Sequence, residues 1–140
     1  MFNVKLEANA SYDIEINSIN FRHKAPSVHR VIWVYMIKEG YQGKEELTEE
    51  WTQIGTGRAP KRNNIVSTVY LDQPLRIKAG ETIGFYLRTE ESIMLVGKFA
   101  KTATIDVNDV KLQYGLALMN SNFAENFSWS GSVEYQIVDN

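Results

Sequence analysis

The densest group of chemically reactive side chains is a set of four glutamates in one polar segment, Glu45, Glu46, Glu49 and Glu50. Two carboxyl groups about 5 to 9 Å apart across a groove are able to cleave a glycosidic bond. Adjacent acids in a long polar loop are usually solvated, however, and a solvated carboxyl group lacks the raised pKa of a general acid. We therefore interpret this block as a charged surface segment.

The sequence lacks the common motifs of catalytic and metal-binding sites. His23 and His29 are six residues apart, without a His-Glu-x-x-His motif, and the chain has no cysteine. No Gly-x-Ser-x-Gly motif marks a nucleophilic serine, and the segment 55–58, Gly-Thr-Gly-Arg, lacks the Gly-Lys-Ser/Thr of a phosphate loop. We therefore expect that the chain is not an enzyme.

Three oxygen-bearing side chains, Asp106, Asn108 and Asp109, lie within four residues of one another. Ca²⁺ takes carboxylate and amide oxygens as ligands, but the twelve-residue loop of an EF-hand, with its glycine and terminal glutamate, is missing. We expect no cofactor, and a Ca²⁺ ion bound by this loop is the alternative.

The densest basic cluster, Arg58, Lys61 and Arg62, lies in a polar loop over residues 56–64. Guanidinium and ammonium groups pair with carboxylate, sulfate and phosphate, so the cluster suits an acidic sugar or another anion. The alternative is a hairpin tip whose charges keep sheet edges apart.

Aromatic residues beside predicted loops are the second feature that suits a ligand. Exposed rings stack on sugars and anchor protein interfaces, because they bury a large area and lose little side-chain entropy. Burial in the core is the alternative reading of each ring. The predicted ligand-binding residues are Tyr41, Trp51, Arg58, Lys61, Arg62 and Trp129.

The elements that must position these residues follow a two-residue period. Apolar and polar residues alternate over 2–9 and again from Tyr12, and a change of phase predicts a bulge or bend near Ser18. The segment 31–37 is apolar on both faces, as in a central strand. Further strands are expected at 51–55, 65–71, 74–77, 82–88, 93–96, 110–118 and 132–138.

About ten short strands separated by turn residues, without a long helical pattern, predict an all-β fold. We expect one domain over residues 1–140, built as an antiparallel two-sheet β-sandwich of the jelly-roll type.

Fifteen Lys and Arg against 17 Asp and Glu give a formal charge of −2, which argues against a nucleic-acid partner. No apolar run approaches the roughly 18 residues that cross a bilayer, so we expect no membrane insertion. The first residues do not form a signal peptide.

The segments 34–55, 73–87 and 127–135 together resemble a β-sandwich domain of bacterial secreted and surface proteins. That domain is similar to the PHR sandwiches of large eukaryotic ubiquitin ligases, in which a proline-initiated strand and a terminal Gly-x-hydrophobic-x-Tyr pattern also occur. The resemblance implies a non-catalytic interaction module in a secreted or cell-surface setting, and it carries over no catalytic residues.

These observations predict a module that presents loops from a β-sandwich to a protein or glycan ligand, as in adhesion or carbohydrate binding. The alternative is a structural subunit of a capsid, fibre or surface layer that assembles into a homo-oligomer.

Overall fold

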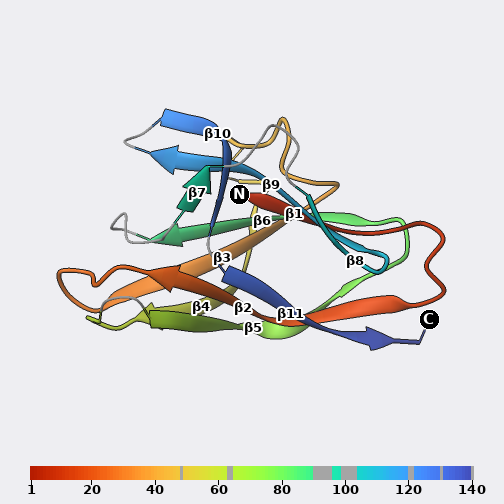
Figure 1. Cartoon of the computed structure of the whole chain (residues 1–140), viewed down its shortest axis with the longest axis horizontal. Coiled ribbons are helices and arrows are strands. Elements are labelled where there is room, and N and C mark those ends of the chain that lie inside the picture. The colour runs from red at the N-terminus through yellow and green to blue at the C-terminus, as the bar shows by residue number, and fades with distance from the viewer. Residues whose placement is uncertain are drawn as a thin grey trace.

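The computed structural model of the chain describes residues 1–47, 49–62, 65–89, 96–98, 104–119, 122–129 and 131–139. Within these ranges the chain forms β-strands and no helix (Figure 1). The strands are β1 (Phe2–Leu6), β2 (Asp13–His23), β3 (Arg30–Lys38), β4 (Thr52–Ala59), β5 (Ile65–Ile77), β6 (Thr82–Thr89), β7 (Val96–Lys98), β8 (Thr104–Val107), β9 (Val110–Met119), β10 (Asn122–Trp129) and β11 (Gly131–Val138).

These strands belong to one sheet, with the order β11-β2-β5-β4-β3-β6-β1-β9-β10-β7, and β8 pairs with β9. Its neighbouring strands are antiparallel. The sheet curls into a half-barrel, so that its two ends face each other across the interior (Figure 1). The predicted all-β antiparallel class is confirmed. The predicted division into two separate sheets is not shown, because hydrogen-bonded neighbours continue from β2 through β5 and β4 to β1.

Strand β3 lies between β4 and β6, which agrees with its prediction as a central strand. Its two faces meet different surroundings. Ile32, Val34 and Met36 are buried in the interior, whereas Trp33 and Tyr35 point to the other side of the sheet and are half-buried. The apolar character of both faces therefore reflects a core on one side and partial cover on the other.

The predicted irregularity near Ser18 is a bulge in β2. Ser18 pairs with Glu134 of β11 and Ile16 pairs with Tyr135, which leaves Asn17 without a partner in that ladder. The bulge restores the alternation of buried and exposed residues after the change of phase. In β5, Tyr70 pairs with Ser18 and Leu75 with Ile16, so the two strands expected at 65–71 and 74–77 form one irregular strand.

Two glycines allow β4 to approach β5 closely. Gly55 pairs with Leu71, and a Cβ atom added at Gly57 would lie 2.7 Å from Cγ2 of Val69. A side chain at position 57 would therefore push the strands apart. This contact joins the two parts of the curled sheet, which are β11-β2-β5 on one side and the strands from β4 to β7 in the sheet order on the other.

The interior is filled mainly by apolar side chains from β1, β2, β3, β5 and β6. Phe2 of β1 and Phe85 of β6 stack with ring centroids 5.2 Å apart. Among the described residues, the largest fully buried side chains are Phe2, Val4, Leu6, Ile14, Ile16, Ile19, Phe21, His23, Ile32, Val34, Ile77 and Phe85.

Candidate functional site on the outer face of the sheet

A row of outward-pointing side chains crosses five strands. Side chains of directly paired residues point to the same side of an antiparallel sheet. Ser18 pairs with Tyr70, and Trp33 pairs with both Thr56 and Arg88. The pairing of Gly55 with Leu71 places Thr56 beside Tyr70. We call the set Ser18, Tyr70, Thr56, Trp33 and Arg88 the outer-face row.

Tyr70 is the most exposed aromatic residue for which burial is described. It has 71% of its surface accessible, although it lies in the middle of β5. Its neighbours across the strands, Ser18 and Thr56, are too small to cover its ring. The ring is therefore available to stack on a ligand.

Arg88 forms the β6 end of the outer-face row. Its guanidinium carbon lies 5.4 Å from the ring centroid of Trp33, which is a cation–π contact. Trp33 is half-buried and Arg88 is exposed, so the indole holds the cation at the surface. Three steps between neighbouring strands separate Tyr70 from Arg88, or about 14 Å.

Arg58 lies beside this row. It pairs with Val31 of β3, and the register of β4 on β5 places it next to Thr68. Arg58 is exposed, as are Lys61 and Arg62 in the segment that follows β4. The structure thus brings one residue of the predicted basic cluster onto the outer face and places the other two beyond the end of its strand.

A hydrogen-bonded polar network borders Tyr70 on the β2 and β11 side. Ser18 Oγ donates to Oε2 of Glu134 at 2.8 Å, and Asn20 Nδ2 donates to Oε1 of Glu134 at 3.1 Å and to Ser132 Oγ at 3.0 Å. Thr68 Oγ1 donates to Oδ1 of Asn20. The bonds from Ser18 and then Asn20 lower the pKa of Glu134. These polar groups are held in fixed positions beside the exposed ring.

Tyr41 and Trp51 lie in a different place from the outer-face row. They form a small apolar cluster with Ile37, and they are 7% and 9% exposed. Trp51 Nε1 donates to the carbonyl oxygen of Lys44 at 2.9 Å. Their placement corresponds to the core alternative, and their rings offer little surface for stacking.

Trp129 is the last residue of β10 and pairs with Val96 of β7. Its side chain lies outside the described part of the structure, so its predicted binding role stays a prediction.

The predicted calcium ligands lie where β8 turns into β9. Asp106 is in β8, and Asn108 and Asp109 form the turn, with Asn108 at a φ of 54°. Asp109 Oδ2 accepts a hydrogen bond from the Tyr12 hydroxyl at 2.9 Å. Among the described residues, no group of three or more His, Cys, Asp or Glu side chains is placed to hold a metal ion. Calcium binding by this loop stays a prediction.

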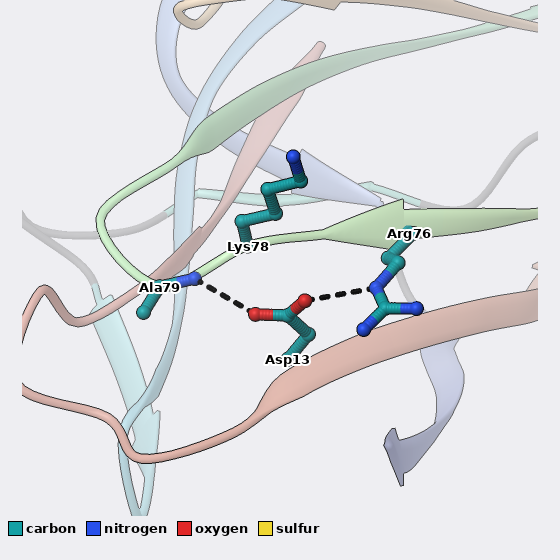
Figure 2. A pocket seen from close by; sticks show the side chains of 4 residues that line it. All are labelled: Asp13, Arg76, Lys78 and Ala79. Atoms are coloured by element: carbon teal, nitrogen blue, oxygen red, sulfur yellow. Dashed lines mark hydrogen bonds and ion pairs between the residues drawn. The ribbon is translucent and has the colours of Figure 1, made fainter. Parts of the chain in front are cut away.

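An open depression of about 590 Å³ is lined by Asp13, Arg76, Lys78 and Ala79 (Figure 2). The carboxylate of Asp13, 6% exposed, accepts hydrogen bonds from Arg76 Nε at 2.8 Å and from the Ala79 amide at 3.4 Å. Arg76 also donates to the carbonyl oxygen of Asp139 at 2.8 Å. These bonds tie the start of β2 to the end of β5 and to the chain after β11, which is a structural role.

Sequence reasoning missed Tyr70, Trp33 and Arg88. Each lies inside a predicted strand, and Trp33 is part of an apolar run that predicts burial on both faces. Alternation alone places Tyr70 and Thr68 on one face of their strand. It does not say which strand lies beside them, so the row becomes visible only with the register between strands.

Together, these features define an all-β protein with one curled antiparallel sheet and a row of hydroxyl, aromatic and basic side chains on its outer face, in which Tyr70, Thr56 and Arg88 are exposed. Comparison of the chain with protein-family models, curated proteins and solved structures found no match. In the part of the chain that the structure describes, no helix has the length and apolarity needed to cross a membrane.

Proposed function

We propose that this protein is a non-catalytic binding module that holds an acidic glycan on the outer face of its sheet. The observation that carries the proposal is the outer-face row, in which an exposed tyrosine and an arginine held on a tryptophan lie about 14 Å apart. A single ring or a single cation would be ordinary on a protein surface. Their alignment across paired strands suits an extended ligand.

The chemistry of the row matches the chemistry of a charged sugar chain. The flat ring of Tyr70 suits the apolar face of a sugar. The guanidinium groups of Arg58 and Arg88 suit a carboxylate or a sulfate. The hydroxyl and amide groups of Thr68 and Asn20 suit neutral sugar hydroxyls.

Charge sets the direction in which such a ligand would lie. Glu134 stands on the β11 side of Tyr70, and Arg58 and Arg88 stand on the β3 and β6 side. An acidic group near Glu134 would be repelled, whereas one near the arginines would be attracted. We therefore place the charged part of the ligand over β4, β3 and β6.

A glycan suits this face better than a folded protein partner. Protein interfaces usually have an apolar centre from which charged groups are depleted. The neighbours of Tyr70 are the polar residues Ser18, Thr56 and Thr68. The same face would also be exposed if the chain formed the expected two-sheet sandwich. The proposed ligand therefore does not depend on whether the strands form one curled sheet or two sheets.

The test is a binding screen against immobilised neutral, uronic-acid and sulfated polysaccharides, followed by calorimetry on the best ligand. We expect a sulfated or uronic ligand to bind, with an affinity that falls as salt rises. Tyr70→Ala and Arg88→Gln should each weaken binding about tenfold or more, which corresponds to roughly 1.4 kcal/mol. Lys78→Gln, which removes an exposed cation from the depression of Figure 2, is the matched control and should bind normally.

Three results would contradict the proposal. Acidic glycans that fail to bind the purified protein would reject the ligand class. Binding that survives both Tyr70→Ala and Arg88→Gln would reject the outer-face row. A ligand that binds equally well at low and high salt would reject the role of the arginines.

A further inference from the structure

Strand β11 is an edge of the sheet. It is the first strand in the order, and among the described residues its ladder partner is β2 alone. On such a strand, about every second residue directs its N–H and C=O groups away from the sheet. These groups are a template for one more strand.

The sequence of β11 does not protect this edge. Edge strands usually carry lysine, proline or a bulge that prevents further pairing. Gly131–Val138 contains neither residue, and the extra residue of the irregularity at Ser18 belongs to β2. Its one charged side chain, Glu134, is hydrogen-bonded to Ser18 and Asn20 on the outer face.

The inward-facing row of β11 is also incompletely covered. Val133 and Tyr135 are half-buried and Ile137 is 57% exposed. Their partners in β2, Ile19, Ile16 and Ile14, are fully buried. The apolar layer of the sheet therefore continues one strand beyond the cover that the described chain provides. An added strand would bury it further.

The segment 133–137 is self-complementary when it runs antiparallel to a copy of itself. With Tyr135 on a two-fold axis, Tyr135 faces Tyr135 of the copy, Val133 faces Ile137, and Glu134 faces Gln136. Apolar residues then meet on the inner side and no like charges are opposed. Centring the axis on Glu134 would pair the same number of residues of 131–138 but would place two carboxylates directly opposite each other.

We propose that β11 pairs antiparallel with β11 of a second copy of this chain, across a two-fold axis at Tyr135. The resulting homodimer joins two curled sheets into one. Its interface is isologous, so it closes at two copies rather than growing into a fibre. This inference does not depend on the glycan proposed for the outer face.

The absence of cysteine from the chain allows a direct test of the register. Cα atoms of opposed residues in an antiparallel pair lie about 4.5 to 5.5 Å apart, within the range of a disulfide. Tyr135→Cys should therefore form a disulfide-linked dimer under mild oxidation. Glu134→Cys and Gln136→Cys, both at exposed positions, should crosslink when mixed and should each crosslink much less alone. A single variant at 134 or 136 that crosslinks as fast as the mixture would overturn the register.

Light scattering and sedimentation from micromolar to millimolar protein test the dimer itself. We expect a monomer–dimer equilibrium that Ile137→Lys weakens by roughly tenfold or more. Val66→Lys changes a residue of similar exposure, 54% against 57%, on the outer face of β5, and should leave the equilibrium unchanged. A protein that stays monomeric throughout this range, or a dimer that Ile137→Lys leaves intact, would overturn the proposal.

Discussion

The outer side of β3 and β6 has a covered end and an open end. At the covered end, Tyr35 stacks on Tyr86 with centroids 5.9 Å apart, and Trp51 contacts Tyr86 edge-on at 5.9 Å. At the open end, Trp33 carries the guanidinium of Arg88. Both ends are aromatic, yet within the residues that the structure describes the chain folds back over the first end alone.

The two ends differ because the segment between β3 and β4 packs over the covered end. The buried amide of Asn3 fixes this segment, because its Oδ1 accepts from the Tyr41 amide at 3.0 Å and its Nδ2 donates to Gln42 at 2.7 Å. Tyr41 and Trp51 then pack on Ile37. Burial at this end raises the pKa of the Tyr86 hydroxyl. Outward-facing aromatic residues thus stabilise the fold at one end and remain accessible to a ligand at the other.

The largest expected effect is at the covered end. Trp51→Ala removes a side chain that is 9% exposed, together with its contacts to Tyr86 and Ile37. We expect the free energy of unfolding to fall by about 3 to 5 kcal/mol, as for other buried tryptophans. Urea unfolding followed by circular dichroism measures this change. A loss below about 1 kcal/mol would mean that Trp51 does not pack on Tyr86 and Ile37 as described.

A smaller loss of stability is expected at the junction between the two parts of the sheet. Gly57→Ala would place a Cβ atom 2.7 Å from Val69 Cγ2, and such overpacking costs about 1 to 3 kcal/mol. The double variant Gly57→Ala/Val69→Ala should not lose the sum of the two single losses, because shortening Val69 makes room for the new methyl group. Additive losses in the double-mutant cycle would contradict the close approach of β4 to β5.

The fold class and the bulge were predictable because alternation is a local signal. The change of phase after Ile16 is visible in one segment of the sequence, and the bulge at Asn17 is its direct consequence. The single curled sheet was not predictable in this way. It depends on the junction of β4 with β5, where the signal is two glycines in a segment that also suits a polar loop.

The candidate site was predictable only in part, for the same reason. Arg58 stood out by its charge, and it lies on the outer face. Tyr41 and Trp51 stood out as aromatic residues near loops, and they are buried because Asn3 fixes their segment from 38 or more residues away. Contacts between distant segments leave no pattern in either segment alone.

The outer-face row, to which Trp33 and Arg88 of the open end belong, should show the opposite behaviour from Trp51. Tyr70→Ala removes a ring that is 71% exposed, so the free energy of unfolding should change by no more than about 0.5 kcal/mol. The same urea experiment as for Trp51→Ala measures it. A loss comparable to that of Trp51→Ala would show that the ring packs on the protein and would remove the contrast between the covered end and the outer-face row.

The smallest expected effect concerns Glu134 and appears as a dependence on pH. The pKa of Glu134 is lower in the folded chain, chiefly because of the hydrogen bond from Ser18 and next because of the bond from Asn20. A depressed pKa means that this carboxylate stabilises the fold above its unfolded pKa, near 4.5, and that the stabilisation is lost as the pH falls through the folded value. The wild type should therefore be more stable than Glu134→Gln at neutral pH, and the difference should vanish in acid. Carboxyl titration by NMR gives the pKa directly, and Ser18→Ala should move it back toward its ordinary value. A titration of Glu134 that Ser18→Ala leaves unchanged would show that the network beside Tyr70 is not held in place as described.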